Sequence, residues 1–185
     1  MTVISTGRFR LRWGGIVREQ PLVWREEVSP GDPESVRRIC ELSGFFSAEE
    51  VDMAVELVDE RLAKGVASGY HFLFAQHGDT VLGFACYGPI PGTESSWDLY
   101  WIAVEEKKRG RGLGRKLQAE VERRTALLGG RRLYAWTASR DQYLPTRKFY
   151  ERLGYSQEAT LRDYYKPGEH LVIYVKHLPG ILNSP

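Results

Sequence analysis

The chain has 185 residues, of which 42% are hydrophobic and 27% charged, a composition typical of one well-cored globular domain. A net charge of +2 is too small to favour a nucleic-acid partner, and no apolar segment has the length of a membrane span. Residues 1–12 lack the apolar core of a signal peptide. Cys40 and Cys86 have neither metal-ligand spacing nor the density of a disulfide framework. We expect both to be small buried residues of a protein in a reducing compartment. We therefore expect a cytoplasmic protein without a membrane or nucleic-acid partner.

The first 45 residues open with an irregular, basic extension over residues 1–20, for which no structure is predicted. A strand is expected over residues 21–28. Asp32 followed by Pro33 indicates a helix N-cap with proline at the first helical position, and the predicted helix covers residues 33–43.

A second helix is predicted directly after the first. Ser47 and Glu50 have the spacing of a capping box, and the helix that they open is expected to end near Gly65. The bend over residues 44–46 contains two phenylalanines. It either buries the junction between the two helices, which we favour, or lines a substrate entrance.

The middle of the chain reads as strands. Residues 70–75 and 80–87 form a predicted hairpin with its turn at residues 77–79. The loop over residues 88–96 contains two prolines and cannot be regular, and residues 97–104 form the next strand. A glycine-rich turn follows, and then a predicted helix over residues 115–128.

In the last third of the chain, predicted strands and a predicted helix follow one another. A strand over residues 131–137 precedes a helix over residues 145–153, which ends before Gly154, and strands are expected over residues 156–161 and 171–176. The predicted order is β-α-α-β-β-β-α-β-α-β-β, an α/β (α+β) class in a single domain over residues 21–178 with a tail over residues 179–185. The sequence contains no internal repeat.

The glycine-rich turn is the most informative motif. A strand, a glycine turn and a helix start together suit a phosphate, because the first helical N–H groups are unpaired and the helix dipole favours an anion. A nucleoside-triphosphate loop needs Lys-Ser or Lys-Thr after its last glycine, whereas Gly114 is followed by Arg115 and Lys116. The glycine spacing also departs from the dinucleotide fingerprint.

The turn resembles the pyrophosphate motif of the GNAT superfamily of acetyl-CoA-dependent N-acetyltransferases, which is Gln or Arg, two residues, Gly, one residue, then Gly or Ala. Residues 109–114 match it at every defined position. Residues 149–155 resemble the C-terminal helix of the family, in which an aromatic-Tyr pair precedes Gly and an aromatic residue. The resemblance covers about residues 22–176.

The resemblance implies a strongly twisted, mixed sheet of six to seven strands with helices on both faces, in which the fourth and fifth strands splay apart to admit acetyl-CoA as cosubstrate. It implies that the backbone of Ile102 and Val104 pairs with the pantetheine arm and that N–H groups of the turn hold the pyrophosphate. The predicted cofactor-binding residues are Ile102, Ala103, Val104, Arg109, Gly110, Arg111, Gly112, Leu113, Gly114, Arg115 and Tyr143.

The chain departs from the family at one of these positions. Tyr143 stands where many members have an asparagine, and Pro145 follows it, so the C-terminal helix is expected to begin later and Tyr143 to reshape the wall near the cofactor.

The resemblance also implies catalytic residues. Tyr150 would protonate the departing thiolate. Asp98 is the candidate base that deprotonates the amine, with Glu94 as the alternative, and Tyr100 shares the Asp98 face by strand alternation.

We thus predict an enzyme that transfers an acetyl group from acetyl-CoA to a primary amine by direct attack in a ternary complex. The alternative is a non-catalytic acyl-CoA-binding sensor. The acceptor is a small-molecule amine or a peptide lysine, and the sequence leaves this choice open. The four histidines share no spacing, so no metal is expected. Tyr164 and Tyr165 either stabilise a hairpin or form a homodimer contact.

Overall fold

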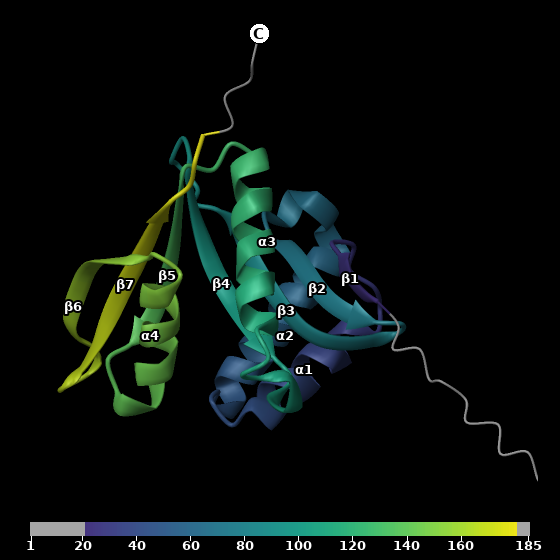
Figure 1. Cartoon of the computed structure of the whole chain (residues 1–185), viewed down its shortest axis with the longest axis horizontal. Coiled ribbons are helices and arrows are strands. Elements are labelled where there is room, and N and C mark those ends of the chain that lie inside the picture. The colour runs from purple at the N-terminus through teal and green to yellow at the C-terminus, as the bar shows by residue number, and fades with distance from the viewer. Residues whose placement is uncertain (1–20, 181–185) are drawn as a thin grey trace, which may run out of the picture.

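A seven-stranded mixed sheet in the order β1-β2-β3-β4-β5-β7-β6 forms the centre of the computed structural model, which describes residues 21–180 (Figure 1). The strands are β1 Leu22–Arg25, β2 His71–His77, β3 Thr80–Pro89, β4 Ser96–Val104, β5 Arg132–Ala138, β6 Ser156–Lys166 and β7 Glu169–His177. The helices are α1 Asp32–Ser43, α2 Ala48–Lys64, α3 Leu113–Leu127 and α4 Leu144–Arg152, with short 3₁₀ turns η1 Gly65–Ser68, η2 Glu106–Lys108 and η3 Asp141–Tyr143. The predicted element order and fold class are confirmed. The extension predicted for residues 1–20 lies outside the described residues, as do residues 181–185 of the tail.

Helices cover both faces of the sheet. Figure 1 shows α3 and α4 in front of it and α1 and α2 behind it. The apolar core divides accordingly: one cluster joins Leu117 of α3 and Tyr150 of α4 to the sheet, and another joins Val36 of α1 and Val58 of α2 to the opposite face. Both cysteines are buried. None of the helices within residues 21–180 has the length and apolar composition of a membrane span.

The two N-terminal helices begin in different ways. The capping box of α2 is confirmed, because the Glu50 N–H donates to Ser47 Oγ at 3.2 Å and the Ser47 N–H donates to Glu50 Oε2 at 2.8 Å. At α1 the prediction that Asp32 caps the helix is wrong. Gly31 occupies the cap, while the 2% exposed Asp32 carboxylate pairs with Arg25 at 2.7 Å. A carboxylate that deep requires an ionic partner, and β1 supplies it.

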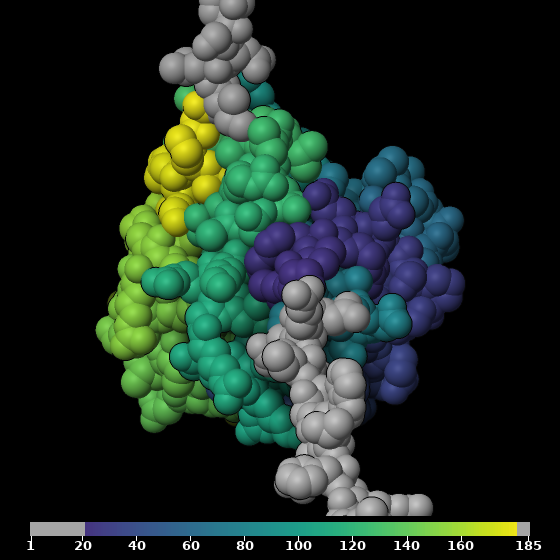
Figure 2. All heavy atoms as spheres, turned by 45° about the vertical axis from the view of Figure 1, so that its right-hand side comes forward, coloured from purple at the N-terminus to yellow at the C-terminus, as the bar shows by residue number. Residues whose placement is uncertain are grey.

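β1 closes the sheet near α3. Glu26, just after β1, forms an ion pair with Arg124 of α3 at 2.7 Å, and Trp24 packs against the α3-side core. Figure 2 shows the purple β1 segment lying against the green α3 at the surface. The first strand therefore packs onto the sheet as an integral edge of the domain.

The C-terminal hairpin is longer than predicted. β6 continues to Lys166, and its residues 162–165 bulge out opposite the single residue His170 of β7. Asp163 has a φ of +53°, and its N–H donates to His170 Nδ1 at 2.9 Å. Backbone N–H groups that donate to the side chains of His170 and Asp163 replace the missing ladder there.

The decisive feature of the sheet is the separation of β4 from β5. Their parallel pairing runs from Ser96–Arg132 to Leu99–Ala135 and stops there, although both strands continue. On the other edge of β4, Tyr87 pairs with Leu99 and Cys86 with Trp101, so Tyr100 is an extra residue in a β-bulge. The bulge shifts the alternation, and Trp97 and Trp101 therefore pack on opposite faces of the sheet. The splay expected from the resemblance is present.

Candidate active site

The glycine turn ends in an open helix N-terminus. Gly110 and Gly112 have φ values of +70° and +81°, in the region that favours glycine, and Gly112 is the N-cap of α3. No side chain caps the helix, and the backbone N–H of Lys116 donates the first helical hydrogen bond, to the Gly112 carbonyl at 3.0 Å. The N–H groups of residues 113–115 therefore stay available at the positive end of the helix dipole.

The protein itself leaves space at this turn. A Cβ on Gly110 or Gly112 would meet nothing within 4 Å, so backbone conformation demands glycine there. At Gly114, inside the first turn of α3, a Cβ would touch the Phe149 ring at 3.7 Å. Arg111 and Arg115 are exposed beside the turn and add positive charge.

The Arg109 side chain extends from the turn towards the bend between α1 and α2. Its Nη2 donates to the Ser43 carbonyl at 3.2 Å, and its guanidinium carbon lies 4.9 Å from the centre of the Phe45 ring. The same bend is held from the opposite side, where Gln142 Nε2 donates to the Phe45 carbonyl at 3.1 Å. The bend thus bridges the elements on either side of the splay.

β4 offers a free edge beyond the splay. Ile102, Ala103 and Val104 remain paired with β3 but have no partner from β5. Unpaired strand edges accept an extended ligand through main-chain hydrogen bonds. The edge leads from the glycine turn to the point where β4 and β5 separate.

Tyr150 lies on the α3 and α4 face near that point. Its side chain is 4% exposed and its ring stacks on Tyr174 at 5.9 Å, and Tyr174 pairs with Ala135, the last β5 residue bonded to β4. Burial raises the pKa of Tyr150, so its hydroxyl stays protonated at neutral pH. α4 begins at Leu144, just after Tyr143, which contacts Phe45 and the Arg140 guanidinium.

Asp98 lines a cavity of about 300 Å³ on the other side of the splay, together with Leu99, Tyr100 and Trp136. Its Oδ1 is buried with no hydrogen-bond partner among the described residues. Burial raises the pKa of Asp98, and the Trp136 indole opposes that rise. Glu94, the alternative base, is exposed in the loop before β4 and is not among the residues that line this cavity.

Tyr150 and Asp98 therefore occupy opposite faces of the sheet. Leu99 packs in the same cluster as Tyr150, while its neighbour Asp98 points the other way by strand alternation. A group that contacts both must pass between β4 and β5. The splay provides that passage, because the two strands cease to be bonded at Leu99.

This geometry agrees with the comparisons. The model of the acetyltransferase (GNAT) family matches residues 36–155. The chain belongs to the GNAT acetyltransferase family. A crystal structure described as a GNAT-family acetyltransferase from Desulfovibrio desulfuricans shares 48% identity with a TM-score of 0.83, covering 86% of this chain and 100% of that one.

More distant structures share the fold. An aminoglycoside 6'-N-acetyltransferase complexed with coenzyme A is 20% identical, with a TM-score of 0.67, over 88% of this chain and 99% of that one. The ribosomal-protein-S18-alanine N-acetyltransferase from Escherichia coli is 16% identical, with a TM-score of 0.67, over 89% of this chain and 99% of that one. No curated protein matches the chain.

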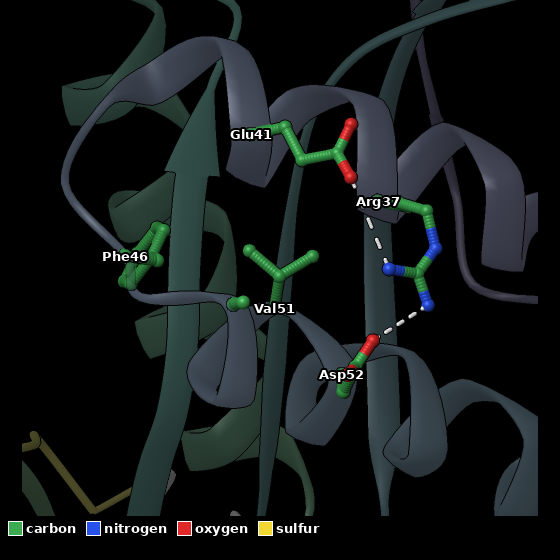
Figure 3. A pocket seen from close by; sticks show the side chains of 6 residues that line it. Arg37, Glu41, Phe46, Val51 and Asp52 are labelled. Atoms are coloured by element: carbon green, nitrogen blue, oxygen red, sulfur yellow. Dashed lines mark ion pairs between the residues drawn. The ribbon is translucent and has the colours of Figure 1, made fainter.

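A second hollow in this GNAT acetyltransferase lies between α1 and α2 (Figure 3). Arg37 points between Asp52 and Glu41, with its nitrogens 2.8 Å and 3.9 Å from the carboxylate oxygens. The Arg37–Asp52 ion pair links α1 to α2 across this hollow. Phe46 on its rim packs on Trp101, at a ring distance of 5.4 Å, which couples the bend to β4.

Sequence reasoning missed Trp136 and Gln142. Trp136 was interpreted only as part of a strand. Leu133 and Ala135 are buried on the Tyr150 face of the sheet, so strand alternation places Trp136 on the opposite face, where half of its side chain is exposed. This alternation was already visible in the sequence of the strand. Gln142 carries no local signal, because its contact with the Phe45 carbonyl joins residues 97 positions apart. The described residues contain no group of three potential metal ligands.

Proposed function

We propose that this protein transfers the acetyl group of acetyl-CoA to a primary amine by direct attack in a ternary complex. The observation that carries the proposal is the position of the splay. It separates a helix N-terminus suited to a pyrophosphate from a cavity that holds a buried carboxylate, and it connects the two through the free edge of β4.

The donor end fits coenzyme A by its chemistry. A diphosphate needs several N–H donors and positive charge, and residues 110–115 supply both around a left-handed Gly110 and Gly112. The pantetheine arm carries amide groups, which the unpaired edge of residues 102–104 can bond in the manner of an added strand. Arg109, Arg111 and Arg115 belong to the turn and its helix start, and Tyr143 packs on Phe45, the ring that Arg109 also contacts.

Asp98 is the proposed base. An ammonium has no lone pair, so the carboxylate first takes one proton from it, directly or through a water. Its unpartnered Oδ1 leaves an acceptor free for that proton, and its raised pKa makes it a stronger base than an exposed aspartate. Asp98 is favoured over Glu94 because Asp98 lines the cavity at the splay.

Tyr150 is the proposed acid. As the amine nitrogen bonds to the acetyl carbonyl carbon, the carbon–sulfur bond breaks and the thiolate takes a proton from the Tyr150 hydroxyl. The second amine proton restores the phenol, so the products are the amide, free coenzyme A and the one proton left on Asp98. The raised pKa of Tyr150 keeps its proton in place until the thiolate forms.

A non-catalytic acyl-CoA sensor is the alternative, because a phosphate turn only binds. Two titratable groups, Asp98 and Tyr150, on opposite faces of the sheet beside the same gap favour catalysis. We place the reaction in the cytoplasm, since Cys40 and Cys86 are buried and unpaired.

The test is free-thiol release from acetyl-CoA with a panel of primary amines, beside acetyl-CoA binding by calorimetry. Amine-dependent thiol release with formation of the amide supports the enzyme. Tight acetyl-CoA binding without thiol release for any amine or lysine peptide would favour the sensor. Absence of acetyl-CoA binding would overturn both interpretations.

A further inference from the structure

The cavity beside Asp98 has apolar, aromatic walls and a single carboxylate. Trp136 of β5 forms one wall with half of its side chain exposed, and Tyr100, the bulged residue of β4, forms another. Tyr100 is held by an edge-on contact with Tyr70 at 5.4 Å. Asp98 is the one carboxylate among the four residues that line the cavity.

The apolar wall continues across the neighbouring strands. Trp136 pairs with Ile173 of β7, and Ile173 pairs with Ala159 of β6, so the three side chains share one face of the sheet. This face is opposite to the one that carries Tyr150. A ligand whose amine meets Asp98 would therefore lay its carbon skeleton along Trp136 and towards Ile173.

The charges argue against a polycation. Each desolvated ammonium needs its own anionic or hydrogen-bonding partner, and the cavity offers one carboxylate. Its volume of about 300 Å³ is at the lower end of small-molecule sites, which suits a compact ligand. Indole and phenol rings attract both an ammonium over their faces and an aromatic ring against them.

We propose that the acceptor is a small monoamine on an aromatic skeleton, an arylalkylamine, with its amine on Asp98 and its ring against Trp136. This assignment rests on the proposed acetyl transfer and specifies its acceptor. Trp136 is then a specificity-determining residue, and Tyr100 fixes the opposite wall.

The first experiment compares acceptors at saturating acetyl-CoA by thiol release: 2-phenylethylamine, n-butylamine, spermidine, kanamycin and a blocked lysine peptide. We expect kcat/KM for 2-phenylethylamine to exceed each of the others by about tenfold or more, from ring stacking and apolar burial. Equal or higher values for spermidine, kanamycin or the peptide would overturn the assignment. An equal value for n-butylamine would overturn its aromatic part.

The second experiment tests Trp136 itself. Trp136→Ala should raise KM for 2-phenylethylamine about tenfold with acetyl-CoA binding unchanged, while Trp136→Phe, which also lacks the indole N–H that opposes the rise in the pKa of Asp98, keeps most of the affinity. Leu127→Ala is the control, since Leu127 is 58% exposed on α3 and outside the cavity, and Trp136 is 50% exposed. The same KM in Trp136→Ala and Leu127→Ala would contradict the role of Trp136.

A third measurement separates this inference from the proposed reaction. If no amine is acetylated, binding of 2-phenylethylamine to the protein saturated with coenzyme A is measured by calorimetry. Binding that Trp136→Ala abolishes retains the arylalkylamine site and rejects only the transfer. No binding to the unmodified protein overturns the inference.

Discussion

The two sides of the β4–β5 splay differ in the groups that they offer a ligand. On the side of α3, the proposed donor site consists mainly of backbone: left-handed glycines, unpaired helix N–H groups and a free strand edge, with arginine side chains adding positive charge. On the side of α1 and α2, the proposed acceptor site consists of side chains, with Asp98, Tyr100 and Trp136 around a small cavity. Backbone groups bind the coenzyme A part of the donor, which is constant, whereas side chains select one acceptor among many.

The largest effect is expected where the two sides meet, at Tyr150. Tyr150→Phe removes the proposed acid and should lower kcat at least about 100-fold, with acetyl-CoA binding unchanged by calorimetry. The hydroxyl is lost from a buried ring that keeps its stacking on Tyr174, so the fold is retained. Unchanged kcat would remove Tyr150 from the chemistry.

Asp98→Asn should affect the acceptor side alone. We expect kcat/KM for the amine to fall about 100-fold, while the dissociation constant of acetyl-CoA is retained. The carboxylate must be ionised to act as base, and burial raises its pKa above the ordinary value of 3.8. Activity is therefore lost as pH falls through that raised pKa. Tyr100 and Trp136 face this carboxylate in the cavity.

The pH profile of kcat/KM checks this assignment. In the unmodified protein the acidic limb should include the Asp98 ionisation, and in Asp98→Asn this contribution should disappear. Glu94→Gln, in the exposed loop before β4, is the matched control and should leave the profile unchanged. If Glu94→Gln alone alters the limb, the base is Glu94.

Gly112→Ala should affect the donor side alone. Its φ of +81° costs an alanine about 1–2 kcal/mol, so the turn would relax and acetyl-CoA would bind about tenfold more weakly. Gly92→Ala is a matched control, because Gly92 has a φ of +79° with equally open surroundings but lies in the loop between β3 and β4. Equal weakening in the two variants would mean that the effect is general strain.

The smallest effect concerns the bend that bridges both sides. Gln142→Ala removes the bonds from Gln142 to the Gly44 and Phe45 carbonyls, at 3.4 Å and 3.1 Å, and should raise the acceptor KM about twofold. Acetyl-CoA affinity should stay constant, since Gln142 lies outside the glycine turn. A change in cofactor affinity instead would assign the bend to the donor side. Steady-state kinetics with calorimetry distinguishes these outcomes.

The same contrast explains what could be predicted from the sequence. The donor side is contiguous: a strand, a glycine turn and a helix within residues 97–128 were readable because each glycine constrains its own backbone. The α2 capping box was equally local and is confirmed. Asp32 was misread because its partner Arg25 lies on another element, and the longer β6 was missed because its bulge is held by His170 across the hairpin.

The acceptor side was less readable because it is assembled across the sheet. Asp98 and Tyr100 were placed together by strand alternation, and both do line the cavity, although Tyr100 is a bulged residue that alternation alone does not describe. Trp136 comes from a strand whose neighbour in space is known only once β4 and β5 pair. Local patterns do not report such non-local pairings.

The most direct test of the account is amide hydrogen exchange with and without acetyl-CoA. A donor site made of backbone predicts slower exchange at residues 102–104 and 110–115 when acetyl-CoA is bound. Gly129 and Gly130, which follow the opposite end of α3 from the glycine turn, should exchange at the same rate in both samples. Unchanged exchange over residues 110–115 under saturating acetyl-CoA would contradict the account.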